Sequence, residues 1–225
     1  MIHIIHKIPH ATDALLRAYA EQAAATVHEA MGQRGAMTPD IKPIAKGMKF
    51  CGRALTVRCH AGDNLMLIKA ISMAKPGDVI VADMGRILNA GPFGEVLATE
   101  CVARGMAGLV VSGAVRDGQA IAELGFPVFA AGLSVCGTSK ATLGTINHPI
   151  TCGQEIVRPG DIILGDDDGV VVVPLEEAEK ILEAARKRTA KEAAVMEQLR
   201  AGASLFDLYG YQKTMDALGC IEESI

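Results

Sequence analysis

The sequence predicts a single α/β domain in which a central β-structure is flanked by helices and followed by a C-terminal helical arm. Short apolar runs alternate with stretches of helical spacing between residues 52 and 130, an order typical of parallel strands joined by helices. The chain has 225 residues, half of them hydrophobic, which suits one large core better than two small ones. A charged stretch of helical spacing then runs from about residue 175 to 201. We therefore expect a core at about residues 11–174 and an arm at about residues 175–225.

The elements of the core follow from local patterns, taken in chain order. Residues 11–32 have apolar side chains at helical spacing and end in a glycine-rich stretch, so we expect one opening helix. Residues 52–59 alternate as a half-buried strand does. Residues 64–74 return to helical spacing, with Asp63 or Asn64 as the candidate cap. After them the expected order is strand, helix, strand, helix and strand, over residues 75–85, 93–105, 106–115, 117–125 and 126–132.

Two similar segments and a run of aspartates predict turns in the chain. KPGD at 75–78 and RPGD at 158–161 each place Pro and Gly at a bend, with an Asp that can cap the turn before a buried run. In GDDDG, residues 165–169, consecutive aspartates of an extended chain alternate faces, and no glutamate follows at the spacing of a calcium loop. We therefore expect a tight hairpin there, not a metal site.

Composition excludes several classes of partner. The net charge of −4 provides no basic field for a phosphate backbone, so we expect no nucleic-acid partner. No apolar run approaches the ~20 residues that span a bilayer, so we expect no membrane association. The six cysteines include no CxxC pair, which is typical of reduced, mostly buried thiols and predicts a cytoplasmic location.

The segment GAVRDG, residues 113–118, places opposite charges where a buried strand runs out into a turn. Adjacent residues of a strand point to opposite faces, so Arg116 and Asp117 are poorly placed to pair with each other. A carboxylate suits a hard divalent cation, and an arginine suits a carbonyl or carboxylate oxygen. The alternative is structural: a local ion pair, or an aspartate that caps the strand end.

In the segment GPFGEVL, residues 91–97, two glycines lead directly into an expected helix. The amides of Glu95, Val96 and Leu97 would then be free in the first helical turn, which suits a small carboxylate. An ordinary helix start, with Glu95 favouring the helix dipole, is the structural alternative.

The charged helix carries an acidic residue among apolar ones. Glu192 falls on a weakly apolar stripe at helical spacing, and a carboxylate on a packing face needs a partner. Either an ion pair with a neighbouring side chain or a nearby functional site would supply it. The stripe is formed by Ile181, Ala185, Thr189, Met196 and Leu199.

FGEVLATECVARGMAGLVVSGAVRD, residues 93–117, resembles the RraA-like family. The family pattern is an acidic residue, twenty residues, and then Arg-Asp, which Glu95, Arg116 and Asp117 fit, with Glu95 standing where the family usually has Asp. The likeness extends over roughly residues 25–190. The arm resembles the tail of the aldolase branch, the 4-hydroxy-4-methyl-2-oxoglutarate/4-carboxy-4-hydroxy-2-oxoadipate aldolases, which RraA regulators lack.

The resemblance implies a class II pyruvate aldolase that depends on Mg²⁺ or Mn²⁺ and acts on a 2-oxo acid. It assigns Asp117 to the metal, Arg116 to the keto oxygen, and the backbone around Gly94, Val96 and Leu97 to the pyruvyl carboxylate. It also implies homotrimers or hexamers with active sites between subunits, where Glu95 and a neighbour's Glu192 face the water around the metal.

Two other functions fit the same resemblance. The family includes RraA, a regulator without catalytic activity that binds ribonuclease E. A 2-oxo acid lyase or oxaloacetate decarboxylase with a different natural substrate would pass through the same pyruvate enolate as the aldolase.

Overall fold

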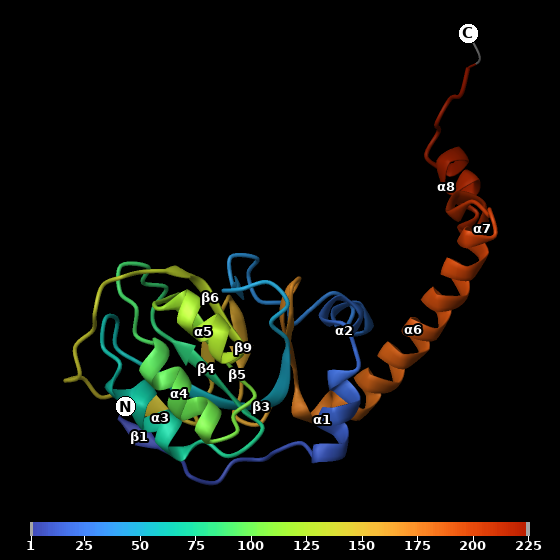
Figure 1. Cartoon of the computed structure of the whole chain (residues 1–225). Coiled ribbons are helices and arrows are strands. Elements are labelled where there is room, and N and C mark those ends of the chain that lie inside the picture. Colours follow the sequence, from blue (N-terminus) through green and yellow to red (C-terminus); the bar gives the residue numbers. More distant parts are fainter. Residues whose placement is uncertain (1, 224–225) are drawn as a thin grey trace.

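The computed structural model describes residues 2–223 as a mixed α/β domain with a central sheet (Figure 1). Within these residues the main sheet has nine strands, and a separate hairpin has two. The strands are β1 His3–Ile4, β2 Lys42–Pro43, β3 Phe50–Arg58, β4 Asp78–Asp83, β5 Gly108–Val115, β6 Val128–Leu133, β7 Thr145–Ile146, β8 Ile150–Cys152, β9 Glu155–Val157, β10 Ile162–Asp166 and β11 Gly169–Val173. The helices are α1 Asp13–Ala20, α2 Ala24–Ala30, α3 Leu65–Met73, α4 Glu95–Ala103, α5 Gly118–Leu124, η1 Leu175–Glu177, α6 Ala178–Arg200, α7 Leu205–Tyr209 and α8 Tyr211–Ala217.

The sheet is built on four parallel strands, β3, β4, β5 and β6, joined by α3, α4 and α5. On the other side of β3, its first half pairs with β10 and its last two residues pair with β7, both antiparallel. Because the four parallel strands run the same way, their carboxyl ends meet at one edge of the sheet, where ligands of such folds commonly bind.

The alternation of side chains along the strands divides the core into layers. In β4, Ile80 and Ala82 face the cluster that includes α3, α4 and α5, while Val79 and Val81 face the opposite side. Successive residues of a strand point to opposite faces, so a strand covered on both sides is apolar throughout. The three helices lie together on one face of the sheet (Figure 1).

A second layer closes the other side of the sheet. Residues of β8, β9 and the β10–β11 hairpin pack with Phe50 and Phe129, whose rings meet edge to face at 4.9 Å. On the outer side of the hairpin, Ile162 and Leu164 pack against α1, α2 and the start of α6. The hairpin is therefore covered on both faces. Its two turn residues follow Asp166, which pairs with Gly169, so the hairpin expected at GDDDG is confirmed.

The long helix α6 leaves the body beside α1 and α2 and carries α7 and α8 away from it (Figure 1). Its first half is anchored: Ile181 and Ala185 are buried, and the Tyr19 hydroxyl donates to the Ala178 carbonyl over 2.7 Å. Beyond Ala185, its side chains are exposed or half-buried. None of the helices in residues 2–223 combines the length and apolar character that a membrane crossing requires.

The opening segment differs from the sequence prediction. The single helix expected over residues 11–32 is wrong: the chain forms α1 and α2, separated by a turn at residues 21–23 in which Ala23 is extended. The Ala24 amide, at the start of α2, donates to the Asp166 carboxylate over 2.8 Å. A residue 142 positions away thus caps α2. No local sequence pattern predicts such a cap.

The two PGD turns are built alike, as the sequence predicts. Asp78 accepts a hydrogen bond from the Lys75 amide, and Asp161 accepts one from the Arg158 amide, each over 2.8 Å. Both turns need glycine, because Gly77 and Gly160 have φ of +82° and +90°.

Candidate active site at the carboxyl end of β5

Arg116 and Asp117 follow the last residue of β5, a strand that is buried along its whole length. The Arg116 amide donates to the Phe93 carbonyl over 2.9 Å, and the Ser134 amide donates to the Val115 carbonyl over 2.8 Å. The strand end is therefore held between the segment that precedes α4 and the segment that follows β6. This position is the carboxyl edge of the parallel strands, as the sequence predicts for the site.

The prediction that Arg116 and Asp117 point apart is wrong. Nε of Arg116 lies 3.5 Å from Oδ2 of Asp117. The opposite-face rule applies only within a strand, and β5 ends at Val115, while Asp117 has a left-handed backbone with φ of +57°. That conformation turns the Asp117 side chain back beside its neighbour. Both side chains remain close to half exposed, at 45% and 40%, so the pair stays open to a ligand.

Asp117 also joins the strand end to the start of α4. Its Oδ2 accepts a hydrogen bond from the Glu95 amide over 3.1 Å, so the expectation of three free amides in the first turn is wrong for Glu95. Within residues 2–223, the amides of Val96 and Leu97 donate to no other group. Two N–H groups and the positive end of the helix dipole are left for an anion.

Two glycines allow the segment before α4 to approach the Arg-Asp pair closely. A Cβ added at Gly94 would lie 2.3 Å from Oδ2 of Asp117 and 3.0 Å from Nε of Arg116. A Cβ at Gly91 would lie 2.9 Å from Cβ of Arg116 and 2.6 Å from the Ser134 carbonyl oxygen. The local structure therefore requires glycine at both positions, for space and not for an unusual backbone angle.

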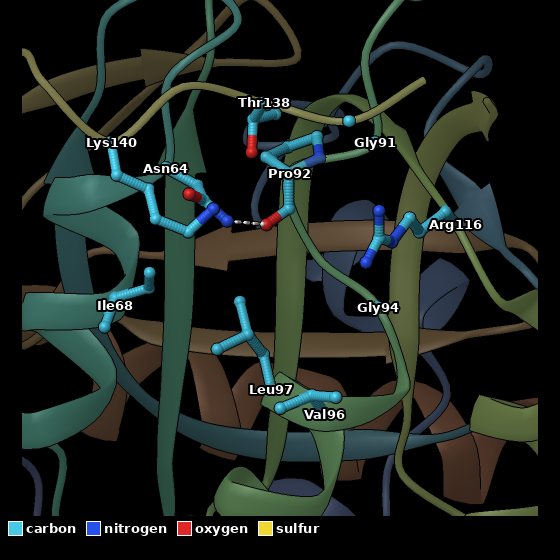
Figure 2. Close-up of a pocket in the computed structure, with 11 residues that line it drawn as sticks. Asn64, Ile68, Gly91, Pro92, Gly94, Val96, Leu97, Arg116, Thr138 and Lys140 are labelled. Atoms are coloured by element: carbon cyan, nitrogen blue, oxygen red, sulfur yellow. Dashed lines mark hydrogen bonds between the residues drawn. The ribbon is translucent and has the colours of Figure 1, made fainter. Parts of the chain in front are cut away.

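A cavity of about 390 Å³ lies between α3, the start of α4 and the loop after β6. Arg116 lines one side of it and Lys140 another, and Val96, Leu97 and Ile68 form an apolar floor (Figure 2). The remaining lining residues are Asn64, Gly91, Pro92, Gly94, Gly137 and Thr138. A pocket with an apolar floor and a few cationic and polar groups suits a small organic acid.

Asn64 places an unpartnered acceptor at this cavity. The residue is 6% exposed, and its Nδ2 donates to the Pro92 carbonyl over 2.7 Å, while its Oδ1 has no hydrogen-bond partner within the described chain. A buried acceptor without a partner is costly.

Asp63 holds the loop that carries Lys140. The buried carboxylate accepts hydrogen bonds from the Ser139 hydroxyl and from the amides of Ala141 and Thr142, and its other oxygen accepts from the Leu65 amide. Burial alone raises the pKa of Asp63, but these hydrogen bonds outweigh it and lower the pKa to about 2. Of the two candidate caps of α3, the capping side chain is thus Asp63, and Asn64 is free to face the cavity.

The structure does not bring Glu192 to Arg116 and Asp117 within one chain. Glu192 lies on α6, and its Oε1 pairs with Nε of Arg188 over 2.7 Å, one turn earlier on the same helix. The two halves of the predicted stripe differ, because Ile181 and Ala185 are buried whereas Met196 is 47% exposed. Within a single chain, the neighbouring-ion-pair alternative describes Glu192. The Glu95 side chain is exposed and has no hydrogen-bond or ion-pair partner among the described residues.

Asp117 is the carboxylate that best fits a hydrated divalent cation. Its Oδ2 is engaged by Glu95 and Arg116, whereas Oδ1 makes no hydrogen bond or ion pair in residues 2–223. No three His, Cys, Asp or Glu side chains of these residues gather as a metal centre. Mg²⁺ keeps several waters and is often held by one or two carboxylates, so this donor set fits it and does not fit a zinc site with four side-chain ligands.

Three polar residues of the cavity are missing from the sequence prediction. Lys140 and Thr138 lie in a loop without a recognisable motif, and Asn64 is marked in the sequence only as a candidate helix cap. Nothing local indicates that the loop after β6 folds over the start of α3, because its anchors on Asp63 lie 76 to 79 positions away.

Comparisons with known proteins agree with this fold. A family model described as Aldolase/RraA, RraA-like, matches residues 24–172. A Halalkalibacterium halodurans protein named "Putative 4-hydroxy-4-methyl-2-oxoglutarate aldolase" is 40% identical over 158 residues, which are 70% of this chain and 75% of that protein. An Ectopseudomonas mendocina protein of the same name is 33% identical over 125 residues, 56% of this chain and 76% of that protein.

A solved structure extends the likeness beyond the sequence matches. Streptomyces coelicolor RraAS2, described as an unusual member of the RNase ES inhibitor RraA protein family, aligns with a TM-score of 0.73 and 25% identity, over 84% of this chain and 99% of that one. The span matched by the family model contains Glu95, Arg116 and Asp117 and ends before Glu192.

Proposed function

Because the chain belongs to the RraA-like family, we propose that it is a divalent-metal-dependent, class II pyruvate aldolase. Its proposed substrates are 4-carboxy-4-hydroxy-2-oxoadipate and 4-hydroxy-4-methyl-2-oxoglutarate, cleaved to pyruvate plus oxaloacetate or to two molecules of pyruvate. The observation that carries the proposal is the Arg116–Asp117 pair beside two free helix amides, with Arg116, Val96 and Leu97 lining the 390 Å³ cavity. The names of the two similar aldolases support the same reaction.

The chain's own groups account for substrate binding. The pyruvyl carboxylate fits the free amides of Val96 and Leu97 beside Gly94, and the Arg116 guanidinium reaches the 2-oxo oxygen. The Lys140 ammonium, on another wall of the cavity, suits the carboxylate at the far end of the substrate. A diacid or triacid is favoured for this reason.

The Arg116 guanidinium also stabilises the reaction. Cleavage of the C3–C4 bond leaves negative charge on the 2-oxo oxygen as a pyruvate enolate, and a fixed cation beside that oxygen lowers the barrier. A divalent cation held by Asp117 supplies Lewis-acid stabilisation of the same charge. Oxaloacetate decarboxylation forms the same enolate, so we expect it as a side activity.

The proton of the C4 hydroxyl needs an acceptor. Glu95, at the start of α4, has an unpaired and exposed carboxylate that can hold a water for this purpose. Glu192 is proposed as the second such carboxylate, supplied by a neighbouring subunit, because the arm that carries it extends away from its own body (Figure 1).

An assembly with sites between subunits, as a trimer or hexamer, is part of the proposal. Apolar side chains beside the Arg-Asp pair support it, because Val135, Val96 and Leu133 are 93%, 79% and 61% exposed. Leu133 and Val135 lie in a second hollow that Arg116 and Asp117 also line. Exposed apolar groups clustered beside a polar site indicate a surface that another chain covers.

The likeness to RraAS2 favours a second candidate function, regulation of a ribonuclease without catalysis. Arg116 and the cavity discriminate between the two. A regulator needs neither the Arg116 guanidinium nor a divalent metal, whereas the aldolase needs both.

A coupled assay of pyruvate release tests the proposal. Purified protein is given the two proposed substrates and oxaloacetate, with chelator, with Mg²⁺ and with Mn²⁺. We expect turnover that chelator abolishes and either metal restores. Activity that persists in chelator, or substrate trapped on the protein by borohydride, would show a Schiff-base mechanism instead. No turnover of any 2-oxo acid would favour the regulator.

Complementation tests the role of Glu192. Asp117→Asn and Glu192→Gln chains are each expected to be nearly inactive alone and to regain partial activity after mixing and exchange of subunits. Some interfaces then pair an intact Asp117 with an intact Glu192 from another chain. Mass measurements must show that the subunits have exchanged and that the assembly is intact. Exchanged but inactive mixtures would place Glu192 outside a shared site.

A further inference from the structure

A second cavity, of about 450 Å³, lies at the opposite edge of the sheet from Arg116. It opens where β3 and β4 begin, between Arg53, Asp78 and the end of α3, and the segment His6–His10 forms its outer wall. That segment runs along the lower edge of the body between β1 and α1 (Figure 1). We call this space the basic cavity, for the reason given next.

Cationic side chains line the basic cavity in excess. Lys7, Arg53 and Lys75 line it with a single carboxylate, Asp78, and two histidines, His6 and His10, also belong to the lining. That carboxylate is fully engaged, because one oxygen pairs with Nε of Arg53 over 3.0 Å and the other accepts from the Lys75 amide over 2.8 Å. The Arg53 guanidinium additionally donates to the Pro76 carbonyl. Nη1 of Arg53 also lies 3.8 Å from a carboxylate oxygen of Asp13, so the charge of Arg53 is compensated by two carboxylates.

The two lysine side chains remain uncompensated. Within residues 2–223, no carboxylate lies within ion-pair distance of the ammonium group of Lys7 or of Lys75. They come from segments far apart in the chain and line the same cavity. Two cations around a concave surface with apolar parts, here Leu55 and Met73, attract a small anion more strongly than either does alone.

Asn147 adds a second, independent observation. It lines the basic cavity and is 5% exposed, and its Nδ2 donates to the Ile5 carbonyl over 2.7 Å. Its Oδ1, however, has no hydrogen-bond partner within the described chain. The amide cannot be flipped without losing the bond to Ile5, so the free atom is an acceptor. A buried acceptor without a partner is costly, so a donor such as a ligand hydroxyl would stabilise it.

We propose that the basic cavity binds a small organic oxyanion that carries a hydroxyl group beside its charged end. The carboxylate or phosphate of the ligand lies between Lys7 and Lys75, and its hydroxyl donates to Oδ1 of Asn147. Hydroxycarboxylates and phosphorylated polyols share this chemistry. The site is independent of the proposed aldolase reaction, because it lies at the amino ends of the parallel strands and Arg116 lies at their carboxyl ends.

Calorimetric titration of the metal-free, full-length chain tests the proposal with two matched pairs of ligands. Citrate is compared with tricarballylate, which lacks only the hydroxyl, and glycerol 3-phosphate with propyl phosphate. We expect saturable binding of citrate or glycerol 3-phosphate below about 10 mM. The partner without the hydroxyl should bind roughly tenfold more weakly, because it leaves Asn147 unpaired. The stronger pair identifies the charged group of the ligand.

Variants locate the binding. Lys7→Ala and Lys75→Ala should each weaken it roughly tenfold, and Lys46→Ala, an exposed lysine that lines neither cavity, should not change it. Arg116→Ala should also leave it unchanged. Binding that is lost in Arg116→Ala but kept in the lysine variants would assign the ligand to the other cavity and overturn the proposal. Absence of binding, or equal binding within both ligand pairs, would overturn it as well.

Discussion

The end of β5 and the outer half of α6 both carry charges that we assign to the site, yet the fold holds them very differently. Backbone hydrogen bonds on both sides hold Arg116 and Asp117 in place. Gly94 approaches the pair so closely that a side chain there would overlap Asp117. Glu192 is held by one ion pair with Arg188 on its own helix. Such exposed pairs contribute little to stability. A charge in the first region is positioned by its own chain, whereas a charge in the second region needs a partner to position it.

The largest expected effect follows from changing the chemistry of the first region, at Arg116. Arg116→Lys keeps the charge but loses the planar fork that can span two oxygens, and kcat/KM for pyruvate release should fall by roughly 10²–10³. Arg104→Lys is the matched control, because Arg104 pairs with Glu100 on the surface of α4, and it should be near wild type. An Arg116→Lys variant within about threefold of wild type would mean that Arg116 is structural.

A smaller effect should follow from breaking the first region sterically. Gly94→Ala places a methyl group 2.3 Å from Oδ2 of Asp117, so the Arg-Asp pair must shift, and kcat/KM should fall about 10²-fold. Gly132→Ala is the control, since a Cβ there meets no atom within 4 Å. If both variants retain full activity, the rigid positioning that distinguishes this region is irrelevant to its chemistry.

Asp63, which holds the loop that carries Lys140 on the other side of the cavity, offers a test by pH of how this loop is anchored. The pKa of Asp63, about 2 in the folded chain, lies below its ordinary value of about 3.9. Its stabilising contribution is therefore fully present above about pH 4 and is lost as the pH falls through about 2. Asp63→Asn should lose about 1–3 kcal/mol of unfolding free energy at neutral pH and should lack this pH dependence. Urea unfolding of both proteins from pH 6 to about 2 measures it, and parallel curves would contradict the assignment.

The smallest expected effect concerns the arm. Arg188→Ala removes the partner of Glu192 and a 3.6 Å contact with Glu29, and the free energy of unfolding should change by no more than about 0.5 kcal/mol. A loss well above about 1 kcal/mol would show that the chain itself holds Glu192 firmly, and the contrast between the two regions would fail. Measuring the size of the protein before the unfolding experiment distinguishes a loss of assembly from a loss of stability.

Much of the fold follows from local sequence. The apolar runs of β4 and β5, the helical spacing of α3 and the PGD turns are each encoded within about ten residues, because strand and helix periodicity and turn chemistry are local properties. The acid–twenty–Arg-Asp spacing likewise marks Glu95, Arg116 and Asp117 in the chain. The position of the candidate site, at the end of a buried strand, could therefore be predicted.

What the sequence could not determine depends on contacts between distant residues. The break between α1 and α2 is capped by Asp166, the Lys140 loop is pinned by Asp63, and the Arg-Asp pair forms because Asp117 adopts a left-handed backbone against α4. In each case a side chain satisfies a backbone group far away in the chain or reverses a local rule. Residue types alone indicate the chemistry that we propose for this protein, but only tertiary hydrogen bonds decide which of those residues meet.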